Sequence, residues 1–128
     1  MDFNDTPEQA RFREEASSWL AENVPTDEAF RALPPLEQAK LWQKRKYDAG
    51  WACIGWAPEF GGRGASPIEE VIWRQEESKY ELPATFFLIG QGMIAPTLMA
   101  WASDEDKARF LPPLASGCLL YTSPSPRD

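Results

Sequence analysis

The residues of this chain that could carry covalent or metal chemistry are few. The sequence holds no histidine, and its two cysteines are Cys53 and Cys118. The lack of histidine excludes the common Ser-His and Cys-His nucleophile systems and most zinc sites. The cysteines show no metal-ligand spacing, and Cys53 stands among tryptophan and isoleucine, which favours an inert buried thiol. These residues predict no metal site.

A glycine-rich stretch is the second candidate. Gly61-Gly62-Arg63-Gly64 precedes a predicted helix, and the backbone N–H groups of such a loop can cradle phosphate. No strand is predicted before it, and the glycine spacing matches neither the P-loop nor the dinucleotide-binding fingerprint. The stretch is therefore interpreted as a turn.

The elements that would position these residues are helical. Thr6 and Ser66 are each followed by Pro and then by Gln9 or Glu69 at the capping-box position, which predicts helices that begin just after them. The predicted core stripe of the first helix holds Phe12, Ala16, Trp19 and Leu20. The predicted core stripe of the helix that follows Ser66 holds Ile68, Val71, Ile72 and Gln75. Three charged residues are expected outside that stripe: Glu76, Glu77 and Lys79.

Pro35 is predicted to open a helix over residues 36–49, after a connector with a short helical turn. The last half of this helix is basic and is interpreted as a solvated helix end, since cations favour the C-terminal end of the helix dipole. Gly50 is predicted to adopt a left-handed backbone conformation directly after this helix, with Trp51 folding back onto the helix as its hydrophobic partner. Residues 51–60 predict a packed loop. The basic residues are Lys40, Lys44, Arg45 and Lys46.

Residues 86–101 are apolar almost all round, which predicts a buried central helix that Pro96 kinks or restarts. Ser103 is predicted to cap a last helix over residues 104–114. Every predicted element is helical. The fold class is therefore all-α, a helical bundle of about five to six helices.

Composition and charge further restrict the classes of partner that this chain could bind. A chain of 128 residues with 43% hydrophobic residues fits one folded domain. Its 13 Lys and Arg against 20 Asp and Glu give a net charge of −7, which argues against nucleic acid and anionic membrane as partners. No signal peptide or confident membrane span is recognised, so a soluble, cytoplasmic protein is expected.

The end of the sequence differs from the rest. Residues 118–128, CLLYTSPSPRD, can be back-translated into DNA that resembles the transposon end and adaptor of sequencing libraries. We therefore expect one domain over residues 1–117 and an adaptor-derived tail over residues 118–128, and give Cys118 and Tyr121 no functional weight.

Residues 1–117 resemble the N-terminal helical domain of bacterial acyl-CoA dehydrogenases. The resemblance rests on AGWACIGWAPEFGGRGASPIEE, on the acidic helix after it, and on SDEDKARFLPPLASG. Ala102 stands where the family usually has Gly, and Asp106 where Gln is common. Neither departure touches catalysis.

The resemblance implies an FAD-dependent oxidoreductase of fatty acid metabolism that converts an acyl-CoA thioester to the enoyl-CoA. A Glu carboxylate takes the α proton while the β hydrogen leaves as hydride to the flavin. In the family the base and most flavin contacts lie in later domains. No residue here is therefore assigned as catalytic or cofactor-binding, and the fragment alone is expected to be inactive.

The resemblance also implies that the central helix helps to wall the acyl-chain pocket. Four residues at helical spacing are the candidates: Phe86, Ile89, Gly90 and Met93. Implied partners of the intact enzyme are the acyl-CoA, an electron-transfer flavoprotein-type acceptor and further copies of itself. In a truncated chain, apolar residues of the central helix and of the loop over residues 51–60 are expected to be partly exposed.

Two alternatives stay open. One is an acyl-CoA oxidase or nitroalkane oxidase-like flavoenzyme of the same fold, which this domain does not distinguish from a dehydrogenase. The other is a self-contained helical module that binds a partner protein.

Overall fold

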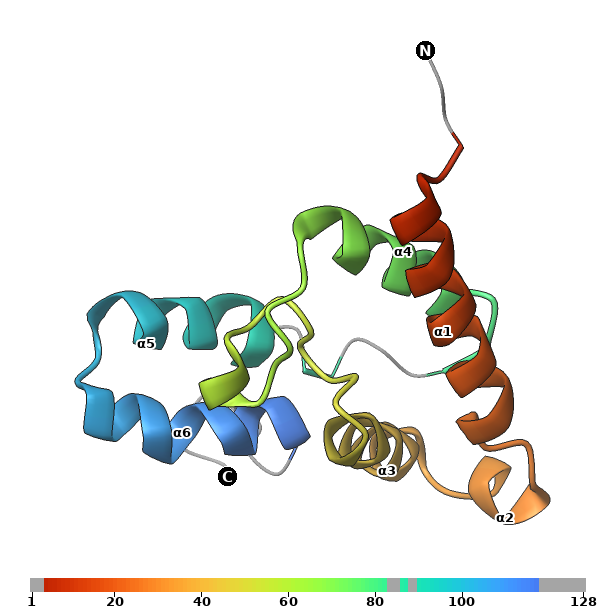
Figure 1. The fold of residues 1–128 in the computed structure, drawn as a ribbon. Helices are drawn as coiled ribbons and strands as arrows, with labels where there is room; N and C mark the ends of the chain where they lie inside the picture. The colour runs from red at the N-terminus through yellow and green to blue at the C-terminus, as the bar shows by residue number, and fades with distance from the viewer. Residues whose placement is uncertain (1–3, 83–85, 88–89, 118–128) are drawn as a thin grey trace.

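The computed structural model describes residues 4–82, 86–87 and 90–117 (Figure 1). Within these ranges the chain forms six α-helices and no strand, which confirms the all-α prediction. A 3₁₀ turn, η1, and a π-helical turn, η2, lie between the helices. In chain order the elements are α1 (Pro7–Asn23), α2 (Glu28–Arg31), α3 (Pro35–Asp48), η1 (Pro58–Phe60), α4 (Pro67–Glu77), η2 (Gly90–Ile94), α5 (Ala95–Trp101) and α6 (Asp104–Ser116).

The starts of α1 and α4 follow directly from their capping sequences. The Thr6 hydroxyl accepts a hydrogen bond from the Gln9 N–H at 3.2 Å, and the Gln9 side chain accepts one from the Thr6 N–H at 2.9 Å. Ser66 and Glu69 make the same reciprocal pair at 3.3 and 2.9 Å. Each box satisfies two backbone donors that the first turn would otherwise leave unpaired. Both predicted helix starts are confirmed.

The end of α3 is likewise determined by residues that are close together in the sequence. Gly50 has φ +82°, its N–H donates to the Tyr47 carbonyl at 3.1 Å, and the Trp51 N–H donates to the Lys46 carbonyl at 2.7 Å. This pair of bonds is the Schellman motif, which requires a left-handed residue after the helix. The motif turns Trp51 back into the core, where it is 3% exposed.

The larger core lies where α1, α3, α4 and the loop after Trp51 meet. In Figure 1, α1 and α4 lie side by side and α3 is seen end-on beneath them. The indole rings of Trp51 and Trp73 stack with centroids 4.6 Å apart and an interplanar angle of 14°. Aromatic pairs of this kind add to the free energy of burial. The buried members of this core are Phe12, Ala16, Leu20, Trp42, Trp51, Ile54, Ile72 and Trp73.

The smaller core joins α5 to α6, which form a helical hairpin beside the first core (Figure 1). Ala95, Leu111 and Leu114 are its buried residues, and α6 also contacts α3 and η1. The helix continues to Ser116, two residues past the predicted end, with Pro112 and Pro113 inside it. The predicted range already contained both prolines, and the helix ends at Gly117, which has φ +81° and is a C-cap that the prediction did not use.

The buried face of α4 differs from the prediction. Three of the four residues expected in its core stripe are exposed: Ile68, Val71 and Gln75. The residues that α4 buries are Ile72, Trp73 and Glu76. The prediction was wrong because it took charge as a sign of exposure. A charged residue can be buried when a partner compensates it, and Glu76 has such a partner on α1.

The loop over residues 51–60 is packed, as predicted, but its first half is more buried than expected. Trp51, Ala52 and Ile54 are 3%, 0% and 4% exposed, so the expectation of partial exposure was wrong for them. The reason is that α1 and α4 already cover this part of the loop, since Phe12 and Ile72 belong to the same core.

Candidate functional site

The apolar stretch over residues 86–101 is not one continuous α-helix where the structure describes it. Residues Gly90–Ile94 form the π-helical turn η2, and α5 begins at Ala95 with Pro96 in its first turn. Pro96 has no N–H to donate to the preceding turn, and its ring crowds that turn. This explains the change of helical geometry at the point where the sequence predicted a kink or a restart.

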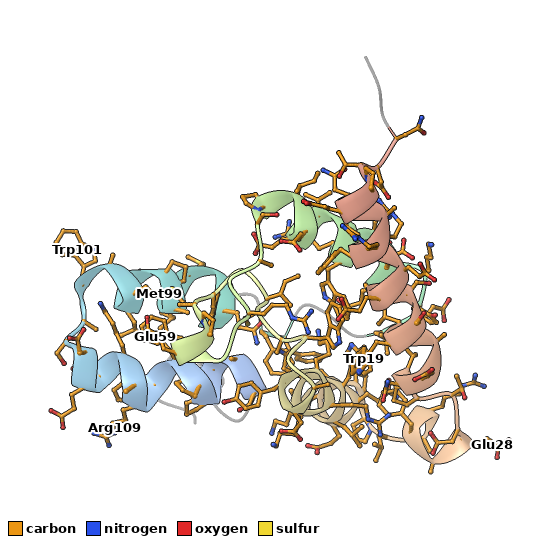
Figure 2. All side chains as sticks on the ribbon, viewed as in Figure 1. Trp19, Glu28, Glu59, Met99, Trp101 and Arg109 are labelled. Carbon is orange, nitrogen blue, oxygen red and sulfur yellow. The ribbon has the colours of Figure 1, made fainter. Side chains whose placement is uncertain are left out.

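The stretch is also not buried all round. Met93 is 63% exposed and Trp101 is 86% exposed, and Trp101 points away from the rest of the molecule at the end of α5 (Figure 2). The prediction of a helix that is buried all round was therefore wrong, whereas the expectation that apolar residues of this stretch are partly exposed in a truncated chain is confirmed for Met93 and Trp101. Only one side of the stretch meets α6, through Ile94, Ala95 and Leu98.

Three of the four predicted acyl-pocket residues can be placed. Phe86 is 41% exposed and Met93 is 63% exposed, whereas Gly90 is buried. Ile89 lies outside the described residues. Phe86 and Met93 thus present apolar side chains to solvent on either side of Gly90 in the chain. None of the three placed residues belongs to the lining of the cavity on the other side of this stretch.

The inner side of the same stretch borders a cavity of about 450 Å³. Its lining includes Phe87 and Gln91, which are four positions apart in the chain. Neither residue was among the predicted pocket residues. Helical spacing alone could not select between the two faces, because the stretch is apolar almost all round. The opposite wall of the cavity comes from α3, α4 and the Trp51 loop.

The charges on this wall compensate each other. Lys46 Nζ lies 3.0 Å from Glu77 Oε2, and the Trp42 indole N–H donates to the same oxygen at 3.2 Å. The Lys46 side chain is only 12% exposed, so the prediction of a solvated basic helix end was wrong at this residue. Lys44 and Arg45 are exposed, as that prediction expects. The wall therefore holds a closed ion pair between Lys46 and Glu77, and its other carboxylate is that of Glu70.

The Cys53 thiol is poorly suited to chemistry. Burial raises the pKa of this thiol to about 12, and the nearby charge of Lys46 opposes the shift only in part. Since the thiolate is the nucleophilic form, the thiol is inert near neutral pH. This agrees with the interpretation from sequence. Among the described residues no group of His, Cys, Asp and Glu could hold a metal ion.

The glycine-rich stretch is a packed turn, as predicted. The backbone N–H groups of residues 61–64 all donate to carbonyl oxygens of residues 54–58, so none of them is free to bind a phosphate. Arg63 is also engaged within the chain. Its guanidinium lies 3.8 Å above the Trp51 ring, and its Nε donates to the Gly50 carbonyl at 2.8 Å. This turn therefore does not fit the phosphates of a flavin dinucleotide.

Two further observations limit the function that the site can have. No helix in the described part of the chain is long and apolar enough to cross a membrane. Apolar side chains, two glycines and an amide gather at η2, with a cavity behind them. The residues of η2 suit contact with an apolar ligand and include no ionisable side chain.

Comparison with known proteins identifies this class of helical domain. Residues 6–118 match the family model described as the N-terminal domain of acyl-CoA dehydrogenase. The chain belongs to the acyl-CoA dehydrogenase family, a family of FAD-dependent oxidoreductases, and corresponds to its N-terminal domain.

Curated relatives and solved structures agree with this assignment. The acyl-CoA dehydrogenases IpdE1 and FadE26 of Mycobacterium tuberculosis are each 32% identical to this chain. Their alignments cover 79% and 95% of this chain, but only 28% and 32% of the relatives. The chain therefore spans about a third of their length.

Two solved structures share the fold. The ChsE4–ChsE5 complex from Mycobacterium tuberculosis matches with a TM-score of 0.72 and 32% identity, over 93% of this chain and 30% of that one. A structure described as the Tcur3481–Tcur3483 steroid ACAD matches with a TM-score of 0.71 and 28% identity, over 94% of this chain and 32% of that one.

Proposed function

We propose that this domain belongs to an FAD-dependent acyl-CoA dehydrogenase that converts an acyl-CoA thioester to the enoyl-CoA. The observation that carries the proposal is the family match over residues 6–118. FAD, when bound, accepts the hydride that leaves the β carbon. The backbone N–H groups of the glycine-rich turn are all bonded within their own loop, and the resemblance assigns the catalytic base to a later domain. The flavin site and the catalytic base are therefore assigned to the parts of the relatives that this chain does not span.

Within this reaction, the role of the domain is to help enclose the acyl group. We assign Phe86, Ile89, Gly90 and Met93 to the wall of the acyl pocket. Support comes from the exposed apolar side chains of Phe86 and Met93 and from the absence of a side chain at Gly90. Apolar side chains at the acyl group exclude water from the reaction, and Gly90 lets the ligand approach the backbone.

The substrate proposal extends to ring-containing acyl groups. Its support is the description of one solved relative as a steroid ACAD. We further propose an electron-transfer flavoprotein-type acceptor, a cytoplasmic location and assembly from identical subunits. The ChsE4–ChsE5 structure is a complex of two named proteins, so the subunit composition of the purified enzyme is part of the test.

The decisive experiment sequences the source DNA beyond the codon for residue 117 and expresses the whole reading frame found there. The intact protein is purified, its flavin spectrum and subunit composition are recorded, and acyl-CoA thioesters with straight-chain and steroid acyl groups are added without oxygen. Bleaching of bound FAD with formation of an enoyl-CoA is expected. The present chain is the matched control and should be colourless and inactive.

Three outcomes would contradict parts of this proposal. An intact protein without FAD, or a reading frame without further domains, would reject the enzyme and favour a helical interaction module. Hydrogen peroxide formation as the main reaction in air would indicate an oxidase. Two different subunits in the purified enzyme would reject assembly from identical copies.

A further inference from the structure

Gln91 connects the candidate acyl-facing turn to the end of another helix. It lies in η2 between Gly90 and Gly92, and its Nε2 donates a hydrogen bond to the Leu114 carbonyl oxygen at 3.0 Å. Leu114 is in the last turn of α6, and its carbonyl oxygen also accepts a hydrogen bond from the Gly117 N–H at 3.3 Å. The side chain of Gln91 therefore adds a second hydrogen bond to this carbonyl and ties η2 to the end of α6.

The surroundings of Gln91 make this hydrogen bond more important than an average one. Gln91 and Phe87 both border the 450 Å³ cavity, so this side of the turn lacks close-packed neighbours. Side chains that line a void lose dispersion contacts on that side. The glycines on both sides of Gln91 also give the backbone more freedom than other residues would. The directional hydrogen bond from Gln91 then fixes this part of the turn, while Ile94 at its other end packs against the smaller core.

The same turn displays the residue proposed to touch substrate. Met93 lies two positions after Gln91 and is 63% exposed, whereas Gln91 faces α6 and the cavity. A single π-helical turn is a rare conformation that occurs frequently at functional sites. In η2 this geometry directs the Gln91 side chain toward α6 and leaves the Met93 side chain exposed. A shift of the anchor would therefore move Met93.

We propose that Gln91 is a positioning residue for acyl-CoA binding. Through its hydrogen bond to Leu114 it holds η2 in the turn that sets Gly90 and Met93 against the acyl group, and it does not itself contact the substrate. The inference rests on the proposed function, because only an enzyme of this kind gives η2 a substrate to face.

The chain contains a matched control for this residue. Gln43 of α3 is buried, and its Nε2 donates to the Ala115 carbonyl at 2.7 Å. It thus makes the same type of bond to the next carbonyl of α6 but belongs to a different element. Loss of the Gln43 bond should loosen the end of α6 without releasing η2.

The tether is tested by amide hydrogen exchange on the 128-residue chain. Gln91→Met keeps the side-chain length and removes the donor. Exchange of the η2 amides should become about fivefold faster, as expected for a hydrogen bond that contributes about 1 kcal/mol. Amides of α1 should be unchanged, and Gln43→Met should leave η2 unchanged. Unchanged η2 exchange in Gln91→Met, or equal acceleration by Gln43→Met, would overturn the proposal.

The substrate role is tested in the intact enzyme. Gln91→Met should raise KM for the acyl-CoA about tenfold, with kcat and FAD content preserved, because only the placement of an apolar wall changes. Gln91→Lys retains a donor and should restore KM. Unchanged KM in an active Gln91→Met enzyme would overturn the positioning role. An inactive unmodified enzyme would instead reject the proposed function and the substrate role with it, whereas the exchange experiment would still decide whether the tether exists.

Discussion

Glu76 of α4 accepts a hydrogen bond from Arg13 of α1 at 2.9 Å, although its side chain is only 4% exposed. Its other carboxylate oxygen accepts one from Lys79 at 2.9 Å. Arg13 also pairs with Asp5 at 2.6 Å. The interface between α1 and α4 therefore contains a compensated ionic cluster beside the apolar core.

The first prediction concerns this cluster. Glu76→Gln should lower the free energy of unfolding by about 2–3 kcal/mol, because two cations lose a buried carboxylate partner. Urea denaturation monitored by tryptophan fluorescence measures the change. Glu14→Gln, at an exposed position of α1, is the control and should stay within about 0.5 kcal/mol. Equal effects of the two variants would show that the buried pair does not stabilise the interface.

The second prediction is a pH dependence of stability. Burial raises the pKa of Glu76, but the hydrogen bonds from Lys79 and Arg13 outweigh it, so the net pKa lies below the ordinary 4.5. The hydrogen bond from Arg13 likewise lowers the pKa of Asp5 from 3.8. A carboxyl with a depressed folded-state pKa stabilises the protein above its unfolded-state pKa, and this stability is lost as the pH falls through the folded value.

Unfolding free energy should therefore fall as the pH is lowered below about 4.5, the ordinary value for Glu76. Glu76→Gln should make this fall shallower, since one of the linked protons is removed. Denaturation curves recorded across this pH range test the prediction. Parallel pH profiles for the two proteins would contradict it.

The third prediction tests whether the glycine-rich residues 61–64 form a packed turn or a ligand-binding loop. Gly62→Ala should cost about 3 kcal/mol, at the upper end of overpacking effects, because its Cβ would meet the Trp56 carbonyl. Gly64→Ala should cost about 1 kcal/mol, because Gly64 has φ +64° but only an ordinary contact with Pro58. Thermal denaturation ranks the two. The reverse order would be inconsistent with the packing described for Gly62.

The fourth prediction concerns the exposed apolar residues of η2 and α5. The double variant Met93→Gln, Trp101→Gln should reduce self-association of the chain, because exposed apolar surface promotes aggregation. Its unfolding free energy should change by less than about 0.5 kcal/mol, since both side chains are already solvated. Size-exclusion chromatography with light scattering measures the association. A similar effect of Leu41→Gln on α3 would show that association does not depend on η2 and α5.

The fifth prediction tests the acyl-pocket assignment in the intact enzyme. Met93→Gln should raise KM for long-chain or ring-containing acyl-CoA about tenfold, because a polar amide replaces an apolar contact with the acyl group. Steady-state kinetics with a series of acyl-CoA substrates provides the measurement. Trp101→Gln, at the opposite end of α5, is the control for a change of exposed apolar surface. An unchanged KM for Met93→Gln would remove Met93 from the pocket wall.

The sequence by itself determined where the helices begin and end and, through the family resemblance, what the domain is. The capping boxes at Thr6 and Ser66 and the left-handed Gly50 use hydrogen bonds within five residues, so the residues that decide them are adjacent in the chain. Such local rules apply before any tertiary contact forms. The predicted bounds differ at α6, which continues to Ser116, and over residues 86–101, where the π-helical turn Gly90–Ile94 precedes α5.

Periodicity correctly predicted the buried side of α1, where Phe12, Ala16 and Leu20 are buried, but only the tertiary structure decided which side of α4 is buried. Glu76 is buried because Arg13, 63 positions away, meets it across the helix interface, and no periodicity in α4 contains that information. The anchor of η2 has the same origin, since Gln91 and Leu114 are 23 positions apart. Burial and polar pairing depend on which elements meet, and apolar spacing within one element shows only that some face will be covered.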